Sequence, residues 1–167
     1  MKYYEPKNPL KSYVTEIHIG DIHFGCGIDP AKHFAILLEQ FISKIAMIDF
    51  DILSIDGDIF DRKLMANSDA VYYAMEFVRL CTEECIKKNA TLIIISGTES
   101  HDAGQLKLFY GYKDEPRLDI RIVEHAQFEY VQGLKILCIP EEYGKGEAYY
   151  HNYLDDVYDT VFMHGTT

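Results

Sequence analysis

Carboxylate and imidazole side chains follow four short β-branched runs in this chain of 167 residues. They occur in Asp21-Ile22-His23, in Gly57-Asp58-Ile59-Phe60-Asp61, in Gly97-Thr98-Glu99-Ser100-His101-Asp102 and at His164. Because the ligand crevice of an open α/β sheet lies beyond the carboxyl ends of its strands, we expect these side chains at one rim. Carboxylate oxygen mixed with imidazole nitrogen suits Mn²⁺, Fe²⁺ or Zn²⁺, whereas an all-oxygen set suits Mg²⁺ or Ca²⁺. The sequence therefore predicts a site for divalent cations.

Each of these pieces alone has an ordinary structural explanation. An Asp-x-His tripeptide arises often by chance, a lone His after a strand is commonly a hydrogen-bonded structural residue, and acidic loops are usually solvated. Their order along the chain and their shared position at strand ends favour the chemical interpretation.

Short strands alternating with amphipathic helices are expected to position these residues. Strands are predicted over 13–19, 52–55, 91–95, 120–123, 128–131, 135–139 and 160–163. Helices are predicted from the Asp29-Pro30 cap to Ile48, from the Ser68 cap to Lys87-Lys88-Asn89, and over 148–158. The chain begins with a β-α-β-α-β order, and antiparallel strands are added after it. Two of these, 128–131 and 135–139, form a hairpin at Gln132-Gly133. The predicted fold is an α/β sandwich with mixed sheets flanked by helices.

The charge balance limits the classes of function. Sixteen Lys and Arg against 27 Asp and Glu give a formal net charge of −11. This excess of acid argues against a free-standing nucleic-acid clamp, which works by placing Lys and Arg on phosphates. It does not argue against an enzyme that meets phosphates through bound cations.

The cysteines favour a reduced, cytoplasmic protein. Cys26, Cys81, Cys85 and Cys138 lack the close paired spacing of a zinc site. Cys81 and Cys85 fall on the apolar face of the second predicted helix, so we expect them to pack in the core. No run approaches the roughly 20 apolar residues of a membrane span, so no membrane partner is expected.

The motifs together resemble those of the calcineurin-like metallophosphoesterases. The ordered signature of that family is Asp-x-His, Gly-Asp-x-x-Asp, Gly-Asn-His-Asp/Glu, a later His, and then Gly-His-x-His. The spellings Gly20-Asp21-Ile22-His23-Phe24-Gly25 and Asp56-Gly57-Asp58-Ile59-Phe60-Asp61-Arg62 are most similar to the SbcD-type double-strand-break repair nucleases, particularly their phage variants. The similarity spans residues 14 to 164, so we expect one metallophosphoesterase (nuclease) domain over 1–167.

The resemblance implies a role for each matched residue. The implied metal ligands are Asp21 and His23 on the first cation, His164 on the second, and Asp58 between the two. His101 would contact the scissile phosphate and assist proton transfer, Asp102 would fix the tautomer of His101, and Asp61 would orient a ligand. The implied cofactors are two divalent cations, Mn²⁺ first, with Fe²⁺, Zn²⁺ or Mg²⁺ as alternatives.

Two departures from the family pattern carry expectations of their own. The block Gly97 to Asp102 is longer than the family's and lacks the asparagine whose amide oxygen holds the second cation. Ser100, Thr98 or a water is expected in its place, with Ser100 favoured because it directly precedes His101. Gly-His-x-His does not occur in this sequence, so we expect an N-terminal fragment whose domain is incomplete at its C-terminus.

The resemblance favours a metal-dependent DNA exonuclease and endonuclease that acts with an SbcC-like ATPase subunit. One alternative is a small-substrate phosphodiesterase or phosphatase of the same superfamily. Another, from a different class, is a non-catalytic interaction module with a degenerate metal site. A truncated sheet exposes an edge and apolar helix faces, so a homodimer is also expected.

Overall fold

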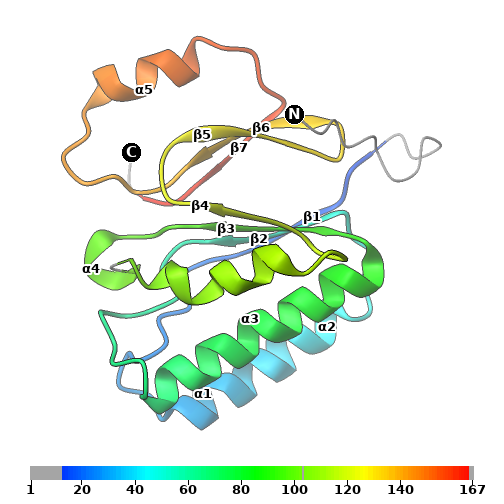
Figure 1. Cartoon of the computed structure of the whole chain (residues 1–167), viewed down its shortest axis with the longest axis vertical. Coiled ribbons are helices and arrows are strands. Elements are labelled where there is room, and N and C mark those ends of the chain that lie inside the picture. The colour runs from blue at the N-terminus through cyan, green and yellow to red at the C-terminus, as the bar shows by residue number, and fades with distance from the viewer. Residues whose placement is uncertain (1–12, 103, 166–167) are drawn as a thin grey trace.

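Two β-sheets lie face to face, with helices on the outer side of each, in the computed structural model of the chain (Figure 1). The structure describes residues 13–102 and 104–165. The first sheet has the order β1-β2-β3-β4 and the second the order β5-β6-β7. The strands are β1 (Glu16–Ile19), β2 (Ile52–Asp56), β3 (Thr91–Ile95), β4 (Asp119–Val123), β5 (Gln127–Val131), β6 (Leu134–Ile139) and β7 (Thr160–Met163). The predicted mixed α/β class is confirmed.

Two of the helices begin at residues whose side chains cap them. They are α1 (Pro30–Leu37), the π-helix η1 (Leu38–Ile42), α2 (Ser43–Ile45), α3 (Asp69–Lys88), α4 (Glu99–Asp102), the 3₁₀ helix η2 (Gln105–Asp114) and α5 (Glu147–Leu154). The Asp29 side chain accepts a hydrogen bond from the Lys32 amide, and Ser68 caps α3 in the same way. Asn89 ends α3 in the left-handed conformation, as predicted. Among the described helices, none is both long and apolar enough to cross a bilayer.

The strand directions correct one expectation. All neighbours in the first sheet are parallel, including β3 and β4, and β6 also pairs in parallel with β7. Only the hairpin of β5 and β6 is antiparallel. The expectation that β4 is an added antiparallel strand is wrong because α4 and the unpredicted η2 form a helical crossover. Such a crossover returns the chain to the starting edge, so β4 runs beside β3 in the same direction.

The central strands of the first sheet, β2 and β3, are buried on both faces. On the helix side, Leu53, Ile55, Leu92 and Ile94 pack against α3 residues that include Phe77, Cys81 and Cys85. On the other side, Ile52, Ile93 and Ile95 pack against the second sheet, through Ile136, Cys138 and Phe162. The core positions predicted for Cys81 and Cys85 are confirmed. Burial on both faces fixes β2 and β3 in place and therefore fixes the loops that leave their carboxyl ends.

A partly exposed polar contact lies where the two sheets meet. The His18 ring of β1 lies with its Nδ1 at 2.7 Å from Asp56 Oδ2 at the end of β2. Its edge meets the ring of Phe162 in β7, with centroids 4.5 Å apart. The hydrogen bond to Asp56 raises the pKa of His18 above its ordinary value. His18 therefore links β1, β2 and the second sheet.

The stabilisation by His18 should depend on pH. Because the pKa is raised in the folded state, the contribution is complete below the ordinary histidine value of about 6.5 and is lost as pH rises through the folded-state pKa. We expect His18→Gln to lower the free energy of unfolding in urea more at pH 6 than at pH 9, by less than about 1 kcal/mol because water screens this partly exposed pair. The exposed His151→Gln serves as the control, measured in EDTA. A His18→Gln effect that is the same at both pH values would contradict this assignment.

Candidate metal centre

The polar strand-end residues meet at one edge of the first sheet, here called the rim. The rim is formed by the loops that follow the parallel strands β1, β2 and β3. The first two loops lie side by side, because the His23 amide donates to the Asp58 carbonyl at 2.9 Å and the Phe24 amide to the Ile59 carbonyl at 2.8 Å. Beneath them, Phe24, Ile59 and Phe60 are fully buried. The two motif loops are therefore anchored in the core and present their polar residues together.

The backbone is unusual at three rim residues. Asp21, His23 and Asp58 have φ values of 53°, 54° and 52°, in the left-handed region that residues other than glycine rarely adopt. Within the described parts of the chain, the other such residues are Asn89 and Gln132, which end a helix and turn a hairpin. Each left-handed residue costs on the order of 1–3 kcal/mol. The strained residues are thus gathered where the candidate ligands lie.

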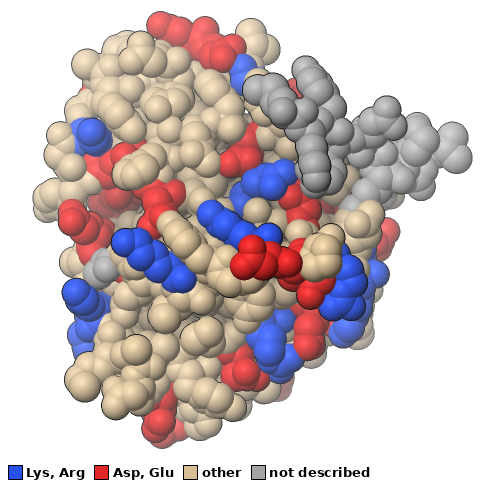
Figure 2. All heavy atoms as spheres, viewed as in Figure 1, with Lys and Arg blue, Asp and Glu red and all other residues tan. Residues whose placement is uncertain are grey.

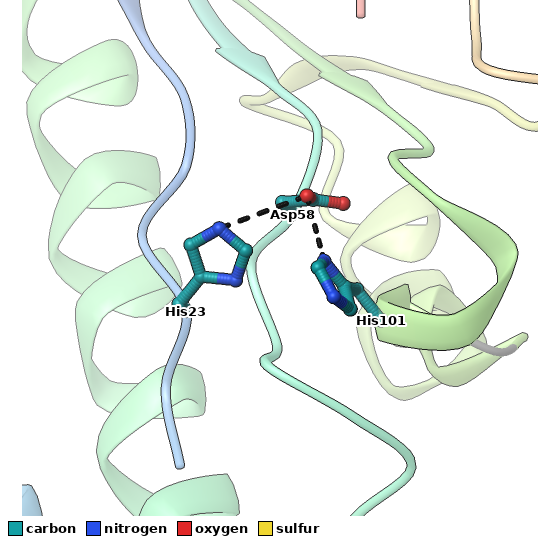
Figure 3. A group of neighbouring side chains, drawn as sticks. All are labelled: His23, Asp58 and His101. Atoms are coloured by element: carbon teal, nitrogen blue, oxygen red, sulfur yellow. Dashed lines mark hydrogen bonds and ion pairs between the residues drawn. The ribbon is translucent and has the colours of Figure 1, made fainter. Parts of the chain in front are cut away.

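Asp58 lies at the middle of the site and is only 4% exposed. The Thr98 amide donates to its Oδ1 at 2.7 Å. Three imidazoles surround its Oδ2: His101 Nδ1 at 2.8 Å, His164 Nε2 at 3.3 Å and His23 Nε2 at 3.7 Å. Figure 3 shows the rings of His23 and His101 directed at the same carboxylate. One buried carboxylate therefore contacts residues from the loop after β1, from the loop and the α4 turn after β3, and from the end of β7.

The imidazoles and amide around Asp58 control its charge. Burial raises the pKa of Asp58, but hydrogen bonds from His101 and from the Thr98 amide, together with the charges of the His164 and His101 rings, outweigh burial, so the net pKa lies below the ordinary value. The same hydrogen bond raises the pKa of His101. Asp58 is thus held as a carboxylate, the form that binds cations.

Two glycines allow the loops to approach closely. A Cβ on Gly57 would lie 2.3 Å from Cγ of His164, and a Cβ on Gly97 would lie 2.2 Å from the backbone nitrogen of Asp58. Gly57 also has a φ of 81°. Any side chain at either position would displace His164 or Asp58, so the glycines of both motifs set the spacing of the site.

The hydrogen-bond pattern of His164 fits a metal ligand. Its Nδ1 lies 2.7 Å from the carbonyl oxygen of Asp56. Because a carbonyl only accepts, Nδ1 carries the proton, and in the neutral ring Nε2 then presents a lone pair toward Asp58 Oδ2. Metal-binding histidines commonly donate their second nitrogen to a backbone carbonyl in this way. Two lone pairs that face each other at 3.3 Å favour a cation between them.

His23 shows a related pattern on the other side of Asp58. Its Nδ1 is buried without a hydrogen-bond partner among the described residues, and Asp61 Oδ1 lies 3.8 Å from it. Its Nε2 faces Asp58 and lies 3.7 Å from Asp21 Oδ1. Asp61 is therefore close to the far side of the His23 ring, where an orienting residue would be, although its other oxygen contacts Arg62 at 3.0 Å.

Two groups of candidate ligands share Asp58. One contains His23, Asp58 and His101 and is called the His23 group; the other contains Asp21, Asp58 and His164 and is called the His164 group. In each group the ligand atoms lie within 4.8 Å of one another. The donor set of carboxylate oxygen and imidazole nitrogen fits Mn²⁺, Fe²⁺ or Zn²⁺. The grouping differs from the expected one, since Asp21 lies with His164, and His101 lies with His23.

Asp102 has a different role from the one expected. Its side chain is fully buried and accepts hydrogen bonds from the amides of Gly97, at 2.7 Å, and Phe60, at 3.2 Å. The expected control of the His101 tautomer by Asp102 is wrong, because consecutive residues of a helical turn point in different directions and His101 bonds to Asp58 instead. The charge of Asp102 still contributes to the raised pKa of His101. Burial raises the pKa of Asp102. Asp102 therefore joins the second and third motif loops and is structural.

Thr98, and not the favoured Ser100, lies in the site. Thr98 contacts Asp58 through both its amide and its hydroxyl, whereas Ser100 is exposed on α4. Glu99 is also exposed. A further residue, Glu141, was not singled out by the sequence: its Oε2 accepts a hydrogen bond of 2.8 Å from the Thr98 hydroxyl. Glu141 follows the strand β6, so the same search of strand ends would have found it.

Comparison with known proteins gives no family for the chain. No family model and no curated protein matches it. One similar solved structure is that of the protein of unknown function AQ665 from Aquifex aeolicus, which is 19% identical, with a TM-score of 0.34. The match covers 81% of this chain and 66% of that protein, so this chain spans about two thirds of its length.

The close approach at Gly97 gives a stability prediction. Gly97→Ala places a Cβ against the backbone and carboxylate of Asp58, which are held in place by the buried residues that follow Asp58. We therefore expect a loss of about 3 kcal/mol in the free energy of unfolding. Gly111→Ala is the control, because a Cβ there meets nothing within 4 Å and should change the stability by less than about 1 kcal/mol. Urea unfolding measures both. Equal stability of the two variants would show that the loops are not packed this closely.

Proposed function

We propose that this chain is a metal-dependent phosphoester hydrolase of the metallophosphoesterase type, with two divalent cations at the rim. The observation that carries the proposal is the sharing of Asp58 by the His23 group and the His164 group. Two cations at the roughly 3.5–4 Å spacing of two-metal sites repel each other, and a shared carboxylate offsets that repulsion. The orientation of His164 by the Asp56 carbonyl supports the same assignment.

Each residue has a distinct task in this proposal. When bound, the two cations would supply Lewis-acid activation of a phosphoryl oxygen and of the attacking water. Asp21, His23, Asp58 and His164 would hold them, and Asp61 would orient the His23 ring. His101 is bonded through Nδ1 to Asp58, which leaves Nε2 for a phosphate oxygen or a leaving group.

The proposed substrate is DNA, with an SbcC-like ATPase as the partner, on the strength of the SbcD-like spelling of the first two motifs. The surface favours help from a partner. In the face shown in Figure 2, Lys and Arg are interspersed with Asp and Glu, and the whole chain has a net charge of −11. A duplex would therefore be held by the cations and by the partner. The same charge favours a small phosphodiester as the alternative substrate.

Asp58 provides the direct test of the shared carboxylate. We expect Asp58→Asn to bind at most one Mn²⁺ in isothermal titration calorimetry, against two for the wild type. Hydrolysis of a chromogenic phosphodiester and of linear DNA should fall about a thousandfold or more, because several kcal/mol of charge stabilisation is lost.

Asp51→Asn is the matched control for that experiment. Asp51 lies at the opposite end of β2, is 8% exposed and accepts a hydrogen bond from the Thr15 amide, which an asparagine oxygen also accepts. This variant should bind Mn²⁺ and hydrolyse substrate like the wild type. Unchanged Mn²⁺-stimulated hydrolysis in Asp58→Asn would exclude the two-metal assignment. Hydrolysis of the small ester without DNA cleavage would favour the alternative substrate.

His101 separates a catalytic role from a ligand role. For His101→Gln we expect two Mn²⁺ to remain bound while hydrolysis falls about 100-fold or more, as for loss of a general acid. Calorimetry and the same hydrolysis assay measure the two effects. Loss of one Mn²⁺ would instead make His101 a ligand of the His23 group, in which it already lies close to Asp58.

A further inference from the structure

We propose that the Thr98 hydroxyl is a further oxygen ligand in the His164 group and that Glu141 is the positioning residue that aims it. This inference rests on the proposed function, because it needs a cation at the rim. Thr98 follows β3 of the first sheet and Glu141 follows β6 of the second, so their hydrogen bond joins the two sheets at the rim.

The hydrogen atoms around Thr98 can be counted. The hydroxyl has one proton, but two carboxylate oxygens lie near it: Glu141 Oε2 at 2.8 Å and Asp58 Oδ2 at 3.3 Å. The hydroxyl donates its hydrogen bond to the nearer acceptor, Glu141 Oε2. The Thr98 oxygen then turns a lone pair toward Asp58, whose oxygen has no proton to donate. Two acceptors facing each other are stabilised by a cation.

His164 makes the same approach to Asp58. Its Nε2 and the Thr98 oxygen both lie 3.3 Å from Asp58 Oδ2, and the Nδ1 proton of His164 is already donated to Asp56. Asp58 Oδ2, the Thr98 oxygen and His164 Nε2 thus bring three lone pairs together. The protons of Thr98 and His164 point away from this place, and Asp58 carries none. Hydroxyl ligands of this kind hold Mg²⁺ in phosphate-binding loops. When the hydroxyl donates its hydrogen bond to a carboxylate, its oxygen becomes a stronger ligand for a cation. Glu141 contributes to the site in this way.

The fold fixes Glu141 against the end of β7. A Cβ on Gly165 would lie 3.4 Å from the Cβ of Glu141, so the backbone after His164 packs on this side chain. His164 and Glu141 consequently approach the rim as neighbours from the parallel pair of β6 and β7. A purely structural contact between sheets would have the same geometry, so the test must separate metal affinity from stability.

The experiment is a double-mutant cycle on the whole chain, with Mn²⁺ affinity read by isothermal titration calorimetry. We expect Thr98→Val to lose 10-fold to 100-fold in affinity at one of two sites, in the range for residues that support metal ligands. Thr98→Ser should stay within about threefold because it keeps the hydroxyl. Glu141→Ala should lose about tenfold alone and nothing more in the Thr98→Val background, because it acts through Thr98.

The control is Glu99→Ala, which removes an exposed carboxylate next to Thr98 and should leave the affinity unchanged. Thermal unfolding in EDTA gives the stability of each variant without metal. The inference would be overturned if the losses of Mn²⁺ affinity in Thr98→Val and Glu141→Ala add in the double variant. It would also be overturned if these variants show only a lower stability in EDTA. If the wild type binds two Mn²⁺ and Thr98→Val binds them equally well, the inference alone fails. If the wild type binds no Mn²⁺, the proposed function fails with it.

Discussion

The rest of the site depends on one buried carboxylate, that of Asp58. Removing a carboxylate from water costs several kcal/mol unless other groups replace the lost hydration. Here the Thr98 amide and the imidazole of His101 do so, at 2.7 and 2.8 Å, while His164 and His23 complete the surround. These groups come from loops far apart in the sequence. The strained backbone and the close glycine contacts follow from the need to bring them to one carboxylate.

The parallel first sheet makes that convergence possible. Because β1, β2 and β3 run in one direction, their following loops leave from one edge. Ligand candidates and core residues then alternate along the motif loops: Asp58 and Asp61 bracket the buried Ile59 and Phe60, and His23 is followed by the buried Phe24. Each polar side chain is thus held by a packed neighbour, which limits its movement more than a free loop would.

The sequence predicts local structure here better than direction and pairing. The caps Asp29 and Ser68 and the β-branched strands are visible because a cap or a buried strand depends on a few adjacent residues. The direction of β4 is not given by the local sequence because it depends on η2, whose glycine-interrupted aromatic run has no clear helical period. The partner of Asp102 was mistaken because adjacency in sequence does not give the direction of a side chain on a helical turn. Glu141 is not visible as a site residue in the sequence because its strand, β6, has the pattern of a hairpin, which gives no sign that its carboxyl end reaches the rim.

Asp56 connects the packing of the sheets to the geometry of the site. Its carboxylate holds His18, whose ring meets Phe162 of β7, and its carbonyl accepts the Nδ1 proton of His164, which follows the same strand. The His23 group comes entirely from segments that follow strands of the first sheet, two loops and the α4 turn. The His164 group also needs the second sheet, which brings His164 and Glu141 to the rim. The two halves of the candidate centre therefore differ in their dependence on the fold: one is complete when the first sheet forms, and the other only when the two sheets pack together.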